Sequence, residues 1–174
     1  MAKPEDKTVL VVDDEEDIAA HLEALLEDAG FNVITAGDGD EALEMVKQHK
    51  PDFISLDLIM PKKSGIKFYY ELRRSREWSK IPVVVVTAHA KDETVRKDID
   101  NTFAGKTISG PKVYLQKPVN PQDYVNLVKR ELGVEVEETP HQEIADLQRK
   151  AQELIDGADP ETLKTIIEQL KKKQ

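Results

Sequence analysis

The sequence predicts an α/β fold: a doubly wound sheet of five parallel strands, covered by helices on both faces and followed by a helical hairpin. Five short apolar runs alternate with segments whose apolar residues recur at helical spacing. This alternation implies right-handed crossovers and a parallel sheet. The length of 174 residues suits one domain of ordinary size with an appendage. We therefore expect a domain over residues 1–133, then a linker and hairpin over residues 134–174.

The strands are predicted from unbroken apolar runs rich in β-branched residues, which are typical of strands buried on both faces. The first run is Thr8-Val9-Leu10-Val11-Val12. The five runs cover residues 8–12, 33–36, 53–56, 83–86 and 113–115.

The helices are predicted from apolar stripes between these runs. Gly30 and Gly133 stand where two helices should end, and Pro51 ends another. A charged segment before the last strand has only a thin stripe. In chain order the stripes are Ile18, Leu22, Leu25 and Leu26; Ala42, Leu43 and Val46; Ile66, Tyr69, Tyr70 and Leu72; Val95, Ile99 and Phe103; and Tyr124, Leu127, Val128 and Leu132.

The tail begins with an acidic linker and is predicted to form two helices. Thr139 suits an N-cap, Pro140 suits the first helical position, and Gly157 separates the helices. A hairpin this short cannot bury both of its apolar stripes alone. We expect it to pack on the domain, a second copy of the chain or a target protein, with a homodimer slightly preferred. The stripe residues concerned are Leu147, Leu154, Ile155, Leu163, Ile166 and Leu170.

Composition excludes several classes of protein. The net charge of -9 argues against nucleic-acid binding, and the tail itself has six Lys and Arg against ten Asp and Glu. No apolar run approaches the roughly 20 residues that span a bilayer, and the start lacks a signal-peptide core. The absence of cysteine excludes disulfides and thiolate metal sites and fits a reducing cytoplasm. We expect a cytoplasmic protein with protein partners and no membrane association.

Polar residues follow four of the predicted strands. Asp13-Asp14, Asp57, Thr87 and Lys117 stand where these strands stop, and ligands of doubly wound sheets bind outside the carboxyl ends of the strands. Taken singly, Asp14 could cap a helix, Thr87 could be an ordinary strand-end residue, and Lys117 could be a solvated charge. Together, three carboxylates in one crevice need a cation, and oxygen ligands without His or Cys favour Mg²⁺ over zinc.

With these motifs the sequence closely resembles the receiver domain of two-component response regulators. The resemblance covers nearly all of residues 7–133 and implies a flavodoxin-like sheet with strand order 2-1-3-4-5. The motifs are Val11-Val12-Asp13-Asp14, Leu56-Asp57-Leu58-Ile59-Met60-Pro61, Gly65, Thr87-Ala88 and Lys117-Pro118.

The resemblance also implies the chemistry. Asp57 would accept a phosphoryl group from a phosphohistidine of a sensor histidine kinase or a phosphotransfer protein. Mg²⁺ would be held by Asp14, by Asp57, by Asp13 through water, and by the backbone carbonyl of Ile59. The protein would catalyse only its own phosphorylation and dephosphorylation, and would signal to a downstream protein that the sequence does not identify.

Three further residues complete the implied switch. Lys117 would pair with the phosphoryl oxygens, through a cis Lys117–Pro118 peptide. Thr87 would hydrogen-bond a phosphoryl oxygen after its loop moves inward, and Tyr114 would turn inward with it. Ile59 and His89 would border the path of the attacking water, and the apolar Ile59 predicts slow hydrolysis.

Residues 102–111 depart from the family's usual length, on the surface that such domains generally use to signal; their role stays open. Three rival classes fit less well. A phosphatase of the haloacid-dehalogenase type would need a second Asp where Ile59 stands. A dinucleotide-binding protein would need a Gly-rich turn where Asp13 and Asp14 stand. A passive interaction module would normally lack Asp57 or Lys117, and both are present.

Overall fold

The computed structural model describes residues 2–90, 93, 97, 101, 110–111 and 113–135. The predicted tail hairpin and most of the long segment before Lys117 lie outside the described residues. The strands are β1 (Thr8–Val12), β2 (Asn32–Ala36), β3 (Phe53–Leu56), β4 (Val83–Thr87) and β5 (Tyr114–Gln116). The helices are α1 (Glu16–Asp28), α2 (Gly39–His49), α3 (Ser64–Arg74) and α5 (Pro121–Glu131), with short 3-10 turns at Pro4–Asp6 and Pro61–Lys63.

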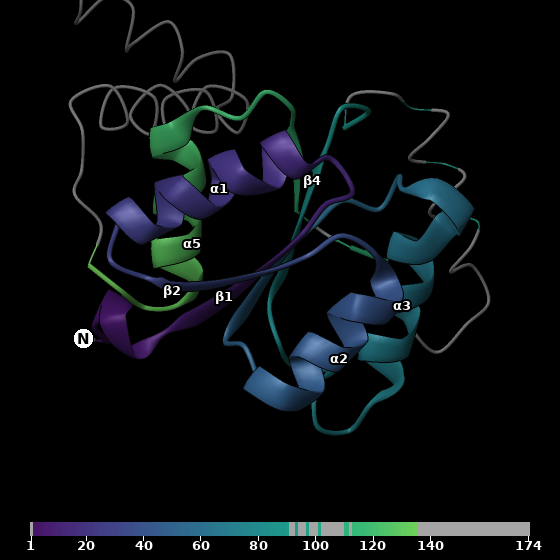
Figure 1. Ribbon diagram of the computed structural model, residues 1–174, viewed down its shortest axis with the longest axis horizontal. Coiled ribbons are helices and arrows are strands. Elements are labelled where there is room, and N and C mark those ends of the chain that lie inside the picture. Colours follow the sequence, from purple (N-terminus) through teal and green to yellow (C-terminus); the bar gives the residue numbers. More distant parts are fainter. Residues whose placement is uncertain are drawn as a thin grey trace, which may run out of the picture. The chain divides into compact units, whose positions relative to one another are not determined.

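The five strands form one parallel sheet in the order β2-β1-β3-β4-β5, so the predicted fold class and strand order are confirmed. In Figure 1, α1 and α5 lie on one face of the sheet, and α2 and α3 lie on the other. The last strand was predicted one residue too early. Val113 accepts a hydrogen bond from Val85 at 2.9 Å, but its side chain is 36% exposed, and regular pairing begins at Tyr114. Val113 is the end of the loop that leads into an edge strand.

Two apolar layers hold the helices against the sheet. Side chains alternate along β1, so Val9 and Val11 face one layer while Leu10 and Val12 face the other. The first layer joins the sheet to α1 and α5 through residues that include Leu22, Leu26, Tyr124 and Val128. The second joins it to α2 and α3 through residues that include Ala42, Val46, Phe68 and Leu72. All the residues just named are at most 2% exposed.

The predicted stripe of α3 omitted Phe68, which is fully buried. Its buried residues are Gly65, Phe68, Tyr69 and Leu72, whereas Ile66 and Tyr70 lie only partly buried at the edge of the layer. Phe68 was missed because an unbroken Phe-Tyr-Tyr run contains no polar residue that would separate the inner face from the outer one. None of the described helices is long and apolar enough to cross a membrane.

The start of α2 packs against the start of α3 with no room for a side chain. Asp38 caps α2 by accepting hydrogen bonds from the backbone N–H groups of Asp40 and Glu41, both at 2.9 Å. Gly39 follows, and a Cβ at this position would overlap the carbonyl oxygen of Ser64 and lie 2.9 Å from its carbonyl carbon. Gly39 therefore allows the two helices to approach.

Replacing Gly39 with Ala should lower the free energy of unfolding by about 1–3 kcal/mol, since the added methyl group must displace backbone. Urea denaturation measures the change. The matched control is Gly37→Ala, two residues earlier, where a Cβ would meet only Glu41 Oε2, at 3.7 Å. Equal stability of the two variants would contradict the close packing of α2 on α3.

Candidate functional site

The parallel register brings the predicted site residues to one edge of the sheet. The ladder continues past the strand ends, where the backbone N–H of Asp57 donates to Val12 at 2.9 Å and that of Lys117 donates to Thr87 at 3.0 Å. Asp13 continues β1 in the same way, donating to Ala36 at 3.0 Å. Asp13, Asp57, Thr87 and Lys117 are thereby fixed by backbone hydrogen bonds at adjacent strand ends.

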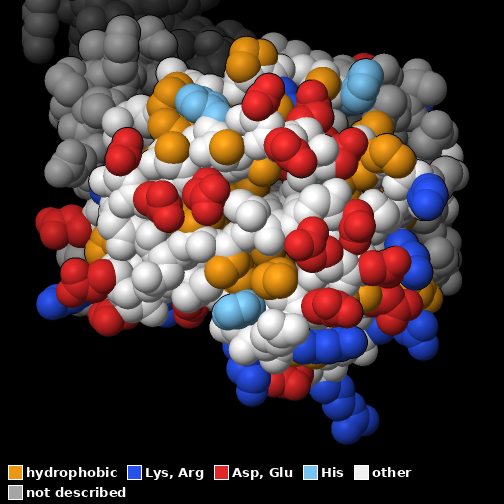
Figure 2. All heavy atoms as spheres, in the orientation of Figure 1, with side chains coloured by type: hydrophobic (Ala, Val, Ile, Leu, Met, Phe, Trp, Pro, Cys, Tyr) orange, Lys and Arg blue, Asp and Glu red, His pale blue; other side chains and the backbone are white. Residues whose placement is uncertain are grey.

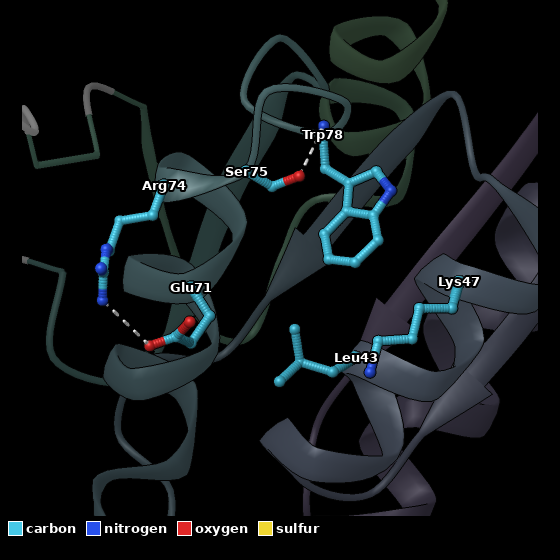
Figure 3. Close-up of a pocket in the computed structure, with 6 residues that line it drawn as sticks. All are labelled: Leu43, Lys47, Glu71, Arg74, Ser75 and Trp78. Atoms are coloured by element: carbon cyan, nitrogen blue, oxygen red, sulfur yellow. Dashed lines mark hydrogen bonds and ion pairs between the residues drawn. The ribbon is translucent and has the colours of Figure 1, made fainter.

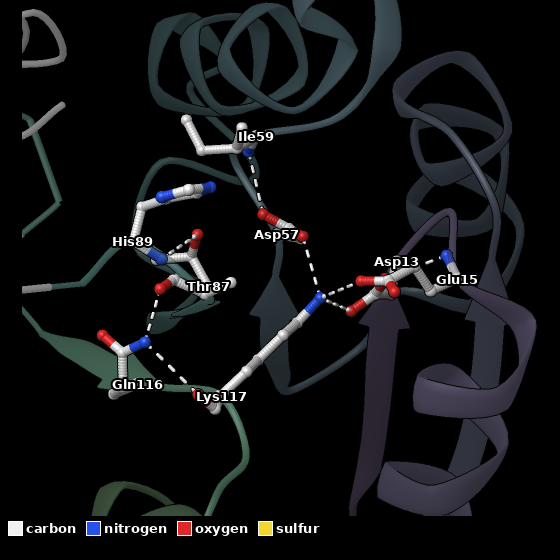
Figure 4. Close-up of polar contacts among 9 residues, drawn as sticks. Asp13, Glu15, Asp57, Ile59, Thr87, His89, Gln116 and Lys117 are labelled. Carbon is white, nitrogen blue, oxygen red and sulfur yellow. Dashed lines mark hydrogen bonds and ion pairs between the residues drawn. The ribbon is translucent and has the colours of Figure 1, made fainter. Parts of the chain in front are cut away.

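Lys117 is the centre of the site (Figure 4). Its ammonium group lies 2.7 Å from Asp13 Oδ2, 2.9 Å from Asp57 Oδ2 and 3.1 Å from Glu15 Oε1. The Lys117 side chain is only 8% exposed. Burial on its own would lower the pKa of Lys117, but the hydrogen bonds to Asp13 and Asp57 and the charges of these carboxylates outweigh it and raise the pKa. Lys117 is therefore a fixed positive charge.

Asp57 is a buried carboxylate, 5% exposed, whose pKa is raised. Burial is the main cause, and the charge of Asp13 acts in the same direction. The hydrogen bond from Lys117 and a bond at 2.8 Å from the backbone N–H of Ile59 to Oδ1 oppose the shift without cancelling it. The ionised form of Asp57 is thus held in place at some cost, which a further cation would reduce.

Asp13, Asp14 and Asp57 can offer ligand oxygens that all lie within 4.8 Å of one another. Asp14 is exposed, whereas Asp13 and Asp57 are buried. A set of carboxylate oxygens without His or Cys has the donor chemistry that Mg²⁺ prefers. The three predicted metal-binding carboxylates are therefore brought together and fit a magnesium ion.

The remaining predicted residues surround this cluster. Thr87 is 2% exposed, and its hydroxyl accepts a hydrogen bond from the backbone N–H of His89 at 3.3 Å. The side chain of Ile59, 40% exposed, lies at the rim of the site (Figure 4). Tyr114 is partly buried against the layer under α2 and α3. The Lys117–Pro118 peptide is cis, as the resemblance implies.

Two residues at the site were not predicted. Glu15 contacts Lys117, and the Gln116 amide donates to the carbonyls of Ala88 and Lys117. Gln116 therefore ties the loop after β4 to the end of β5. Both residues adjoin predicted ones in sequence, but an isolated Glu or Gln beside a strand end is usually solvated, so sequence spacing gave no signal.

Close packing explains why the residue eight positions after Asp57, Gly65, is a glycine. A Cβ at Gly65 would overlap the carbonyl oxygen of Asp57 and lie 2.8 Å from the Cα of Leu58. The first turn of α3 therefore packs directly on the backbone that carries Asp57, and fixes the height of this carboxylate at the sheet edge.

The surroundings of the cluster are strongly acidic. Between Thr8 and Val46 the sequence has twelve Asp and Glu and no Lys or Arg. Two hollows of about 320 and 350 Å³ flank the cluster, and Asp14 lines both. Acidic side chains are prominent on the face shown in Figure 2, while Lys and Arg gather towards its lower and right edges. Five acidic residues and no Lys or Arg line the smaller hollow, whereas Lys62 and Lys67 also line the larger one.

Another hollow, of about 400 Å³, lies between α2, α3 and the loop after α3 (Figure 3). Leu43 and Trp78 form apolar walls, and Lys47, Glu71, Arg74 and Ser75 complete the lining. Except for Leu43, these residues belong to the C-terminal halves of α2 and α3 or follow α3, so the hollow lies towards the opposite edge of the sheet from Asp57. Its Glu71 and Arg74 pair at 3.9 Å, and its lining offers neither a metal cluster nor a nucleophile activated by a base.

Comparison with known proteins shows which family this chain resembles. Residues 9–129 match the model of the response regulator receiver domain. The alkaline phosphatase synthesis transcriptional regulatory protein PhoP of Bacillus subtilis is 39% identical over 123 residues, which are 71% of this chain and 47% of PhoP. The polar-differentiation response regulator DivK of Brucella anthropi is 31% identical over 127 residues, 73% of this chain and 97% of DivK. The chain thus spans less than half the length of PhoP and nearly all of DivK.

The structural comparison agrees. The chemotaxis response regulator CheY4 of Vibrio cholerae superposes with a TM-score of 0.60 at 28% identity, over 72% of this chain and 98% of that chain. The similarity covers nearly the whole of that chain and leaves more than a quarter of this one unmatched.

Asp57→Asn should stabilise the protein at neutral pH in metal-free buffer. Because burial raises the pKa of folded Asp57 above its ordinary value of 3.8, folded wild type loses stability as pH rises from that value through the raised pKa. An amide does not titrate, so the gain should be present at pH 7 and shrink as pH falls towards 3.8. Urea midpoints over this range measure it. Asp17→Asn, an exposed acid on α1, is the control, and a similar gain there would contradict the role of burial.

Proposed function

The chain belongs to the family of response regulator receiver domains of two-component systems, and on this premise we propose that it is a signalling switch phosphorylated on Asp57. The phosphoryl donor would be a phosphohistidine of a sensor histidine kinase or a phosphotransfer protein, and the output would be a protein–protein contact. The observation that carries the proposal is the position of Asp57, whose carboxylate lies 2.9 Å from the Lys117 ammonium and can share a cation with the carboxylates of Asp13 and Asp14.

In the proposed reaction a carboxylate oxygen of Asp57 attacks the phosphorus of the donor. The new O–P bond forms as the P–N bond to the donor imidazole breaks, and the imidazole leaves with the bonding electron pair. Positioning and charge stabilisation are the main requirements of such a transfer. Lys117, already beside Asp57, would stabilise the charge on the transferred phosphoryl oxygens.

We propose Mg²⁺ as the cofactor, held by Asp14, Asp57, the backbone carbonyl of Ile59, and Asp13 through water. When bound, the ion would neutralise carboxylate charge and stabilise negative charge on the transferred group. The backbone hydrogen bond from Ile59 to Asp57 Oδ1 supports this arrangement, because it fixes the orientation of the Asp57 carboxylate.

For the switch we propose that the Thr87 hydroxyl exchanges its hydrogen bond with the His89 backbone for one to a phosphoryl oxygen. Tyr114, on the neighbouring β5, would follow the loop inward. Gln116 adds a connection here, since its amide binds the Ala88 carbonyl of the same loop. Movement of Thr87 would thus be felt at β5.

Other aspects of function also stay proposals. We propose that the protein acts on no external substrate and catalyses only its own phosphorylation and dephosphorylation. A cytoplasmic location, and a homodimer through residues 134–174, are consistent with the charge and the tail pattern.

Acetyl phosphate with Mg²⁺ should label the wild-type protein with one phosphoryl group, on Asp57, and Asp57→Asn should remain unlabelled. Peptide mass spectrometry after rapid acid quench measures this. In Asp14→Ala, labelling should require much more Mg²⁺, although the fold should persist because Asp14 is exposed. Label that persists in Asp57→Asn, or labelling independent of Mg²⁺, would overturn the proposed function.

Phosphorylated wild type should lose its phosphoryl group over hours rather than seconds, because Ile59 at the rim offers no hydrogen bond to an attacking water. Ile59→Asn should shorten the half-life by about tenfold, less than the roughly 10²–10⁴-fold of a positioned general acid or base, because an amide can only orient the water. Loss of label after removal of donor gives the rate. Ile59→Val, which stays apolar, is the control; a half-life of seconds that Ile59→Asn leaves unchanged would refute the role of Ile59.

A further inference from the structure

Among the residues that the structure describes, Lys117 has three carboxylate partners, and they differ in one respect. Asp13 and Asp57 belong to the cluster whose oxygens can share a cation, and Glu15 does not. A cation at the cluster would draw on the charge of Asp13 and Asp57 and would repel the Lys117 ammonium. Of these described partners, Glu15 is therefore the one for which the cation does not compete.

The local backbone directs Glu15 towards this contact. Glu15 is the N-cap residue of α1, and its backbone N–H donates to Asp13 Oδ1 at 3.0 Å. Its side chain makes no capping hydrogen bond, although an N-cap side chain that accepts a helix N–H typically stabilises a helix. The carboxylate instead reaches across the end of the sheet to Lys117 Nζ, 102 residues away in sequence (Figure 4).

We propose that Glu15 is a positioning residue that holds the Lys117 ammonium over the site while a cation occupies the cluster. Lys117 would then pass from Glu15 to the phosphoryl oxygens as transfer proceeds. This inference rests on the proposed function. The Glu15 side chain is 62% exposed, so its pairing is screened by solvent and its effect on rate should be moderate.

The test compares Glu15→Gln with Glu16→Gln. Both variants remove one negative charge from adjacent positions at the start of α1, but Glu16 is not among the partners of Lys117. At saturating Mg²⁺, the maximal rate of Asp57 labelling by acetyl phosphate should fall about threefold to fivefold in Glu15→Gln and stay near wild type in Glu16→Gln.

A second readout follows Lys117 directly. Nitrogen-15 NMR should detect the Lys117 ammonium as an ordered signal in the magnesium-loaded, unphosphorylated wild type and in Glu16→Gln. In Glu15→Gln the signal should broaden or vanish when Mg²⁺ is added, yet remain without Mg²⁺, because Asp13 and Asp57 then still bind Lys117. A merely structural role of Glu15 would change the signal equally in both conditions.

The outcomes separate this inference from the proposed function. If wild type is not labelled at Asp57, the proposed function fails. If wild type is labelled but Glu15→Gln matches Glu16→Gln in rate and in the Lys117 signal, only the role of Glu15 is overturned. In a Lys117→Met background, Glu15→Gln should cause no further loss of rate. A full additional loss there would show that Glu15 acts independently of Lys117, and would also overturn the proposal.

Discussion

The structure depends on one balance of charge, that of a buried ammonium against the carboxylates gathered at the carboxyl edge of the sheet. Lys117 pairs with Asp13, Asp57 and Glu15, within 3.1 Å in each case. Buried charges persist only when they are paired and hydrogen-bonded. One ammonium cannot neutralise the whole group, which also includes Asp14, so the edge keeps a net negative charge. The paired charges allow the protein to fold with this site, and the remaining negative charge leaves the site able to respond to cations and to phosphoryl transfer.

The fold makes this balance possible by its rigidity. Parallel strands fix the backbone at each strand end, and two glycines remove the last freedom between sheet and helices. Gly65 sets α3 against the carbonyl of Asp57, and Gly39 sets α2 against the start of α3. Side chains at the edge therefore cannot separate to relieve repulsion. The pKa of Asp57 is raised chiefly because the fold buries this carboxyl group, and to a lesser degree because of the charge of Asp13.

The sheet and most of the site could be predicted from sequence because their signals are local. A β-branched run such as Val83–Val86 is compatible with few structures other than a strand. The topology of the sheet then places the polar residue at its end, Thr87, beside the polar residues at the other strand ends. The stripe of α3 was less predictable, since Phe68 and Tyr70 are equally apolar and only packing distinguishes them. Glu15 was not predictable at all. Its contact with Lys117 spans 102 residues of sequence and depends on a side chain that makes no capping hydrogen bond to α1.

The acidic residues of the site differ in burial, and this difference divides them into an inner and an outer pair. Asp13 and Asp57 lie inside the fold, at 3% and 5% exposure, so their charges interact strongly with Lys117. Asp14 and Glu15 are exposed, and water screens them, so either can change partners at little cost. The inner pair therefore fixes the geometry, while the outer pair adapts to whatever charge arrives. An arriving cation or phosphoryl group therefore meets a buried pair of carboxylates with fixed positions and an exposed pair that can change partners. Lys117 pairs with members of both groups.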